Sequence, residues 1–204
     1  MATEEPLEQP RSRRQIPKRL LDATRQKFMH FGAHRATMAD ITRELGIPRQ
    51  AIYEYVSSRD ELIEAVLVQR IFEIADLVKP PQSKSFADAL VDTAVGAIRT
   101  ARKDPELMNL VATAPKDLVQ RVVVGRHQEV HDVVVHLFEP ILDQGYKSGL
   151  VRTDKSRDAI IDWFRIVFLA LITQAGIDPD QEHSAIADFL LPSILAPQAN
   201  RGSS

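Results

Sequence analysis

The chain has no cysteine among its 204 residues, which excludes disulfide bridges, thiol nucleophiles and metal sites built on sulfur. Glycine is scarce, with 8 residues, and no apolar run approaches the roughly 20 residues that a transmembrane helix requires. The opening residues, "MATEEPLEQPRSRR", contain no apolar stretch like that of a secretory signal peptide. From these absences we expect a cytoplasmic protein without a membrane anchor.

Charge is unevenly distributed along the chain, although the formal net charge is only −2. Residues 11–70 contain 12 Lys and Arg against 7 Asp and Glu, whereas residues 71–204 contain 14 against 18. A basic segment on an acidic body is typical of a protein in which that segment meets a polyanion. The first third of the chain is therefore the place to look for such a partner.

Apolar residues recur at helical spacing along most of the chain, and no segment alternates as a strand would. We therefore expect an all-α protein of about nine helices. The ranges predicted to be helical are 16–31, 37–45, 48–55, 58–78, 84–103, 105–112, 115–147, 154–174 and 179–195. Pro140 is expected to kink the helix over 115–147, because proline removes one backbone hydrogen bond.

The stretch "TMADITRELGIPRQAIYEYVSSRDEL" contains two helix-start signals around a glycine turn. Thr37 and Asp40 have the spacing of a capping box, and Ser58 with Glu61 repeats it. Gly46 suits the end of the first short helix, because a tight turn there favours positive φ. Two short helices joined in this way, between two further helices, form a helix-turn-helix unit.

The second short helix of this unit carries side chains suited to the major groove of DNA. Arg49 can pair with guanine, Gln50 with adenine, and Ala51 can pack against the methyl group of thymine. The hydroxyl groups of Tyr53 and Tyr55 suit phosphate oxygens, which fix the register of a protein on the duplex. This pattern predicts a DNA-reading element.

The stretches "RLLDATRQKFMHFG" and "TMADITRELGIPRQAIYEYVSSRDELIEAV" resemble the TetR family of bacterial transcriptional regulators, over about Ile16 to Val66. The resemblance implies that Thr37, Tyr53 and Arg59 contact DNA phosphates. It also implies base contacts from the turn and the second short helix, which here are Pro48, Arg49, Gln50 and Ala51.

The same resemblance implies a helical C-terminal part that binds a small molecule and forms a homodimer through its last two long helices, 154–174 and 179–195. The run "AIIDWFRIVFLALI" is apolar on more than one face, as a helix needs if it packs both inward and against a partner. Residues that could line the ligand pocket are Phe86, Met108, His127, His131, Phe138, Trp163, Phe164 and Phe168.

The predicted domain organisation follows from these assignments. In chain order it comprises a disordered basic arm (1–15), a helix-turn-helix DNA-binding domain (16–57), a connecting helix (58–79), a helical ligand-binding and dimerisation domain (84–196) and a disordered tail (197–204). We expect a repressor that binds a pseudo-palindromic double-stranded DNA operator and is released by a small-molecule effector. The sequence also admits a ligand-dependent activator or a corepressor-dependent regulator.

Two alternatives come from other functional classes. The segment "HQEVH" places His127 and His131 four residues apart on one helical face, which suits two metal ligands. A metal-dependent helical hydrolase would use this pair, but no spacing nominates a third ligand. We therefore expect that the protein is not an enzyme and has no metal site and no catalytic residues. The other alternative is an interaction module whose helix-turn-helix no longer binds DNA.

Overall fold

The computed structural model describes residues 15–83, 85–125 and 127–197. The predicted arm over 1–15 and the predicted tail over 197–204 lie outside these residues except for Gln15 and Pro197. Within the described ranges all regular elements are helical, which confirms the all-α class, and the β structure is limited to an isolated antiparallel bridge between Val151 and Leu195. In the same ranges, none of the helices combines the length and the apolar character needed to cross a membrane.

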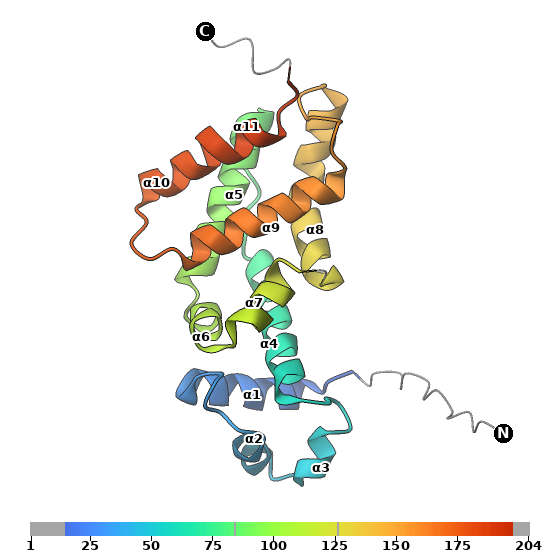
Figure 1. Ribbon diagram of the computed structural model, residues 1–204, viewed down its shortest axis with the longest axis vertical. Helices are drawn as coiled ribbons and strands as arrows, with labels where there is room; N and C mark the ends of the chain where they lie inside the picture. Colours follow the sequence, from blue (N-terminus) through green and yellow to red (C-terminus); the bar gives the residue numbers. More distant parts are fainter. Residues whose placement is uncertain (1–14, 84, 126, 198–204) are drawn as a thin grey trace, which may run out of the picture.

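The helices follow one another through the chain as shown in Figure 1. They are α1 (Lys18–Phe31), α2 (Met38–Leu45), α3 (Arg49–Ile52), α4 (Arg59–Ala75), α5 (Phe86–Lys103), α6 (Pro105–Thr113), α7 (Lys116–Val123), α8 (Gln128–Lys147), α9 (Arg157–Thr173), α10 (Pro179–Ser184) and α11 (Leu191–Ile194). A π-helical turn, Ala185–Leu190, joins α10 to α11 without a break.

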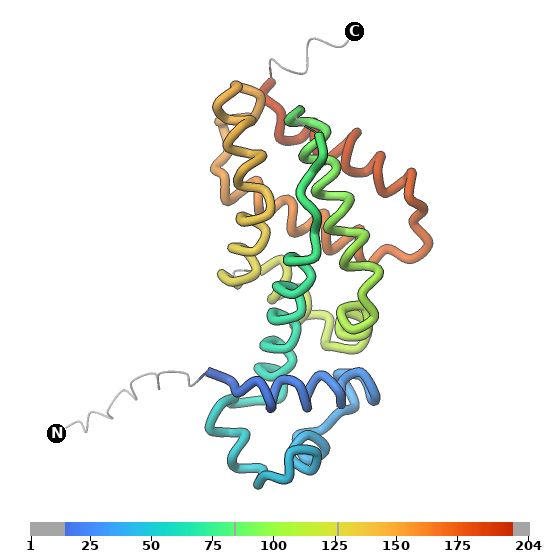
Figure 2. The backbone as a smooth tube through the Cα atoms, turned by 180° about the vertical axis from the view of Figure 1, so that it is seen from behind, coloured from blue at the N-terminus to red at the C-terminus, as the bar shows by residue number. Residues whose placement is uncertain are grey.

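The first three helices form one end of the molecule, with α1 lying across the base of α4 and with α2 and α3 below it (Figure 1). Helix α4 rises from this end into the remaining helices, the chain continues to the far end, and α5 runs back down beside this extended segment, as the view from behind shows (Figure 2). The elements at the far end from α3 are α11, the start of α5 and the end of α8. This arrangement leaves α3 as an outward-facing element.

Hydrogen bonds between residues close in the sequence determine where α2 and α4 begin. The hydroxyl oxygen of Thr37 accepts a hydrogen bond from the backbone N–H of Asp40 at 3.2 Å, and Asp40 accepts the N–H of Thr37 in return, which completes the capping box. Ser58 caps α4 by accepting the N–H of Glu61 at 3.1 Å, while the Glu61 carboxylate accepts the N–H of Ser57. Both capping residues expected from the sequence therefore act as caps.

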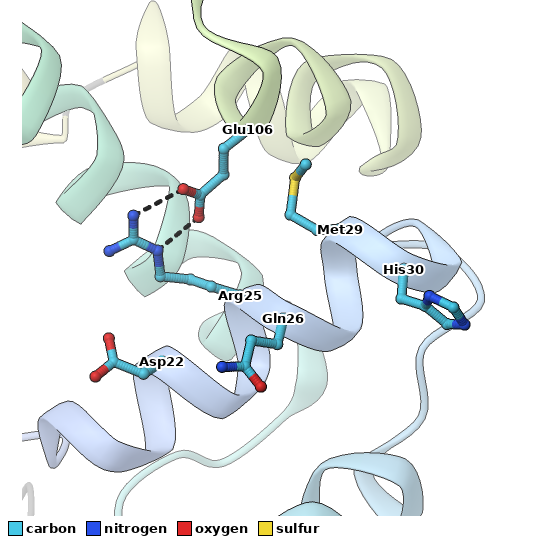
Figure 3. Close-up of a pocket in the computed structure, with 6 residues that line it drawn as sticks. All are labelled: Asp22, Arg25, Gln26, Met29, His30 and Glu106. Atoms are coloured by element: carbon cyan, nitrogen blue, oxygen red, sulfur yellow. Dashed lines mark hydrogen bonds and ion pairs between the residues drawn. The ribbon is translucent and has the colours of Figure 1, made fainter.

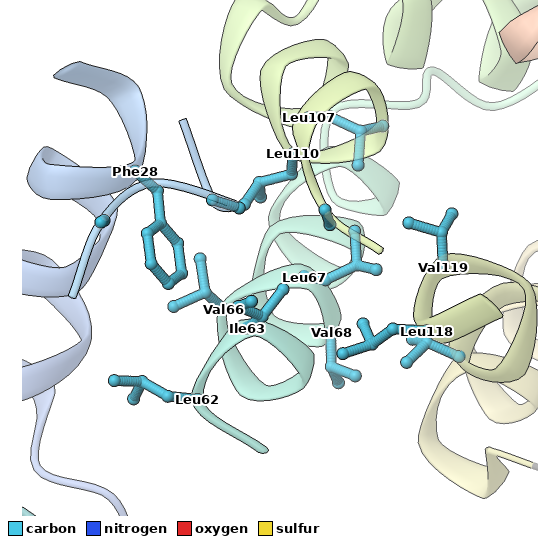
Figure 4. Packing of buried hydrophobic residues seen from close by; sticks show 14 of the residues in the cluster. Phe28, Leu62, Ile63, Val66, Leu67, Val68, Leu107, Leu110, Leu118 and Val119 are labelled. Carbon is cyan, nitrogen blue, oxygen red and sulfur yellow. The ribbon is translucent and has the colours of Figure 1, made fainter. Parts of the chain in front are cut away.

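Two hydrophobic cores hold the helices together. The first contains residues of α1 to α4, as expected for a helix-turn-helix unit, but α6 and α7 also contribute to it. Figure 4 shows Phe28 of α1 to the left of the α4 side chains, with Leu107 and Leu110 of α6 above Leu67. The helix-turn-helix unit is therefore packed as one body with part of the C-terminal region.

The second core lies among α5, α8, α9 and the last helical segment, which consists of α10, the π-helical turn and α11. Its centre contains three phenylalanines: the ring centroids of Phe138 and Phe164 are 4.9 Å apart, and those of Phe164 and Phe168 are 6.1 Å apart. Aromatic pairs at such distances add to the stabilisation that burial alone provides. This core holds the long helices from which a ligand site and a subunit interface would be built.

The prediction of one helix over 115–147 is wrong in the middle, because α7 ends at Val123 and α8 begins at Gln128. A Cβ atom at Gly125 would lie 2.2 Å from the carbonyl oxygen of Arg121, so only glycine fits there. The unpaired carbonyl groups at the end of α7 are satisfied from α9, where Arg165 donates to Val123 at 2.7 Å and also to Gly125. Pro140 lies within α8.

Candidate nucleic-acid interface

The exposed surface of α3 brings the four predicted base-contacting residues together. Pro48, Arg49 and Gln50 are exposed and Ala51 is half-buried, while Ile52, the last residue of the helix, is completely buried in the first core. Pro48 occupies the N-cap position in an extended conformation, so the helix starts at Arg49. One buried side chain thus fixes α3 to the body of the protein, and the rest of the helix faces outward.

Arg49 is held in place by Tyr53 on this surface. Its Nη2 donates a hydrogen bond to the Tyr53 hydroxyl oxygen at 3.0 Å, and its guanidinium carbon lies 5.7 Å from the centre of the tyrosine ring. Tyr53 is itself 42% exposed. The pair therefore presents a cation and a hydroxyl group from a partly ordered arrangement, which lowers the entropy lost when a ligand binds.

Thr37 is exposed at the start of α2, with its hydroxyl group 2.6 Å from the Asp40 carboxylate. The hydrogen bonds from the hydroxyl and backbone N–H groups of Thr37 lower the pKa of Asp40 below its ordinary value. Asp40 therefore stays charged and keeps the cap intact over the neutral pH range. The predicted phosphate contact of Thr37 is consistent with its position, because the amide groups of a helix N-terminus attract anions.

Tyr55 and Arg59 are less available than the other predicted phosphate contacts. Tyr55 is half-buried and packs against the first core. Arg59 is also half-buried, and its Nη2 donates to the backbone carbonyl of Ala33 in the segment between α1 and α2. The structure gives both residues a supporting role beneath the exposed surface, and their contact with phosphate stays a prediction.

A cluster of charged side chains that the sequence did not reveal joins this end of the molecule to α6. Arg25 of α1 binds Glu106 through two hydrogen bonds of 2.6 and 2.7 Å (Figure 3). It also binds Glu73 of α4 through bonds of 2.7 and 2.9 Å. Arg25 and Glu106 lie at one side of an open groove of about 650 Å³ between α1 and α6. One guanidinium group thus bridges three helices.

Arg70 of α4 extends the cluster to the first residues of α6. Its Nη1 lies 2.5 Å from Glu73, and its Nε donates to Asp104 at 2.9 Å. Asp104 in turn caps α6 by accepting the N–H of Leu107 at 2.7 Å. The hydrogen bond from Arg70 is the main reason why the pKa of Asp104 is lowered. We call Arg25, Arg70, Glu73, Asp104 and Glu106 the α1–α4–α6 ion cluster.

The other end of α6 also contacts the helix-turn-helix unit. The hydroxyl oxygen of Thr113, the last residue of α6, accepts the backbone N–H of Ala33 at 2.8 Å. Ala33 follows Gly32, which ends α1. Helix α6 is therefore attached near its two ends to α1 and to the segment that follows α1.

Among the predicted pocket residues, the phenylalanines lie inside the second core. Phe86, Phe138 and Phe164 are buried there, and Phe168 lines an apolar cavity of about 100 Å³. Met108 lines a different, outer groove between α6, α7 and α9, of about 800 Å³.

The remaining three predicted pocket residues have polar partners. Trp163 is 42% exposed, and its indole N–H donates to the hydroxyl oxygen of Ser193 in α11 at 3.0 Å. His127 lies 3.2 Å from Glu64 of α4. His131 lies 3.4 Å from Asp162 of α9. The two histidines thus face acids on different helices, and the residues that the structure describes contain no group of three or more side chains placed to hold a metal ion.

Comparison with known proteins agrees with this geometry. Residues 20–66 match the model of the bacterial regulatory proteins of the tetR family. A helix-turn-helix transcriptional regulator of Mycobacterium tuberculosis (strain ATCC 25618 / H37Rv) is 33% identical over 91 residues, which are 45% of this chain and 39% of that protein. The chain thus aligns with less than half of the length of this curated relative.

Solved structures extend the similarity to most of the chain. The TetR family repressor AlkX from Dietzia sp. superposes with a TM-score of 0.57 at 20% identity, over 86% of this chain and 92% of AlkX. The ligand-free structure of RolR gives a TM-score of 0.61 at 17% identity, over 90% of this chain and 93% of RolR. At such identities the structures establish the fold. Residues 20–66 therefore have the helix-turn-helix sequence of the bacterial regulatory proteins of the tetR family, and the described chain has the fold of solved members of that family.

Proposed function

We propose that the protein is a sequence-specific DNA-binding transcriptional repressor, released from its operator when a small molecule binds the C-terminal region. The observation that carries this proposal is the exposed surface of α3, where Arg49, Gln50 and Tyr53 stand clear of the body. An arginine and a glutamine on such a helix can read base edges in the major groove. Because its target would be the chromosome, we expect it to act in the cytoplasm.

A homodimer through α9 and the last helix fits the surface of the C-terminal region. Three large apolar side chains are exposed on these helices: Trp163 and Ile166 of α9, at 42% and 44%, and Phe189 of the π-helical turn, at 73%. Exposed apolar groups on neighbouring helices are typical of protein interfaces. A two-fold dimer would present two copies of α3 to a pseudo-palindromic operator.

Response to a ligand is supported by the helices that separate the apolar cavity from α3. Ile71 of α4 and Val111 of α6 line the cavity, and both helices are attached to α1 through the α1–α4–α6 ion cluster. A ligand that favours one arrangement of α4 and α6 would change the position of the two DNA-binding units in the dimer. RolR, which has the same fold, is known in a complex with its ligand resorcinol.

The proposal is tested by selecting binding sites from random DNA duplexes and titrating the selected duplex at several salt concentrations. We expect two related half-sites and a steep fall of affinity with salt, because binding releases counterions from the phosphates. The variant Arg49→Ala should lose about 1–3 kcal/mol of discrimination at one base pair of each half-site. Arg121→Ala is the matched control, since Arg121 is exposed on α7.

Enrichment of no sequence, or equal effects of the two substitutions, would contradict the assignment of α3 as the reading helix. A selected duplex that is bound with a shallow salt dependence would instead indicate that phosphate contacts are few.

A further inference from the structure

We propose that the apolar cavity lined by α4, α5, α6, α7, α8 and α9 binds a small, uncharged, apolar molecule, of about the size of a single hydrocarbon ring. The cavity lies where the proposed function needs its effector, and the inference rests on that function for its biological role. The binding chemistry itself is read from the walls of the cavity and can be measured without DNA.

The residues that line the cavity are almost all apolar. Each of the six helices contributes aliphatic or aromatic side chains, such as Ile74 of α4, Ala101 of α5, Val111 of α6, Val134 of α8 and Phe168 of α9. Among the described residues that line the cavity, only Arg165 carries a polar side chain. A ligand with several hydrogen-bonding groups would lose its bonds to water here and find few replacements.

Arg165 looks like a counter-ion for an acidic ligand, but most of its N–H groups already donate hydrogen bonds within the protein. It is 2% exposed, and its Nε donates to the carbonyl oxygen of Val123 at 2.7 Å. Its Nη1 donates to Asp162 at 3.0 Å, and its Nη2 donates to the carbonyl oxygen of Gly125. A carboxylate could form a bidentate pair with this guanidinium group only by displacing bonds that cap α7 or the bond to Asp162. The geometry therefore disfavours anionic effectors in spite of a buried arginine.

The size of the cavity sets the size of the ligand. Its volume is about 100 Å³, which is smaller than the apolar cavity of about 150 Å³ that stays free of water and binds benzene. A single ring is therefore the upper limit of the ligand's size. A bound water molecule needs two to four polar partners. None of the buried side-chain atoms without a partner, in the part of the chain that the structure describes, belongs to a residue that lines this cavity. An apolar molecule would therefore fill space that water does not occupy favourably, and it would gain dispersion contacts.

A route from solvent lies next to the cavity. Val111 of α6 and Leu169 of α9 line both the cavity and the outer groove of about 800 Å³ between α6, α7 and α9. A small molecule in this groove is thus separated from the cavity by two aliphatic side chains. Such side chains change rotamer rapidly, so access requires no unfolding.

The test is a calorimetric titration of the DNA-free, full-length protein with toluene and, separately, with benzoate. The two probes have similar shapes, but benzoate carries a charge. We expect toluene to bind and benzoate to bind at least about a hundredfold more weakly, because its carboxylate would be desolvated without a free partner. The variant Ala101→Leu places a larger side chain in the cavity and should abolish toluene binding. Ala159→Leu, at an exposed position of α9 outside the cavity, should not change it.

A second variant covers the case in which Ala101→Leu fails to fold. Ile172→Ala enlarges the cavity and should increase the affinity for naphthalene relative to toluene at least about tenfold. Benzoate binding as tight as toluene binding, absence of toluene binding, or an unchanged preference in Ile172→Ala would each overturn the inference. These outcomes are independent of operator binding, so a failure of the proposed function would be seen separately in the duplex selection.

Discussion

Replacement of Arg25 by methionine tests whether the α1–α4–α6 ion cluster holds the DNA-binding end to the rest of the protein. The substitution keeps most of the aliphatic part of the side chain but leaves Glu73 and Glu106 with Arg70 as their remaining cation in the cluster. Arg25 is 19% exposed and Glu106 is 15% exposed. Loss of one partner costs about 3–5 kcal/mol for a fully buried ion pair and about 0–1 kcal/mol for an exposed one. For this partly buried, bidentate contact we expect about 2 kcal/mol.

The measurement is urea and thermal unfolding, followed by circular dichroism. For a chain of this size, a loss of about 2 kcal/mol corresponds to a fall in Tm of about 4–8 °C. Arg121→Met is the matched control, because Arg121 forms an exposed pair with Asp117 at 3.4 Å. A double-mutant cycle with Glu106→Gln should give a coupling energy of about 1–2 kcal/mol. If Arg25→Met destabilises the protein no more than Arg121→Met does, the cluster does not tie α1 to α6.

Three further predictions concern the DNA-binding end and its attachment. Tyr53→Phe removes the hydroxyl group that holds Arg49, and duplex titration should show a loss of about 1 kcal/mol in binding. Gly46→Ala should cost about 1–2 kcal/mol in urea unfolding, since Gly46 has a φ of 63° and no neighbouring atom would block the new methyl group. Arg70 lowers the pKa of Asp104 in the folded state, so this stabilisation is complete above the unfolded pKa of about 4 and is lost as the pH falls through the lower folded value. Asp104→Asn should therefore lose less stability than the natural chain when urea unfolding is repeated from about pH 6 down to about pH 3.

Sequence reasoning succeeded where the cause of a structure is local. The Thr37 cap, the glycine turn at Gly46 and the cap at Ser58 each depend on atoms within four residues, so the spacing of residue types reveals them. The burial of Ile52 beneath an exposed Arg49 follows from helical periodicity in the same way.

Long-range contacts explain what the sequence did not reveal. Arg25 and Glu106 are separated by 81 positions, and nothing in either neighbourhood marks them as partners. The break between α7 and α8 had one visible sign, Gly125 in "VVVGRH", but helical periodicity continues on both sides of it. The stabilising partner of the break, Arg165, lies 40 residues from Gly125 in the chain. An arginine within the apolar run "DWFRIVFLALI" was the signal that could have drawn attention to it.

The shared first core limits how this protein can be recombined or evolve. Because Leu107, Leu110 and Leu118 of α6 and α7 pack with α1 and α4, a chimera joined after α4 would carry a core assembled from two unmatched halves. With α3 as the proposed reading helix, exchange of DNA specificity between relatives should be easier by substitution on α3 than by transfer of the whole unit. Arg49, Gln50 and Ala51 can change with little effect on packing, whereas the residues behind them serve both the DNA-binding end and the helices around the cavity.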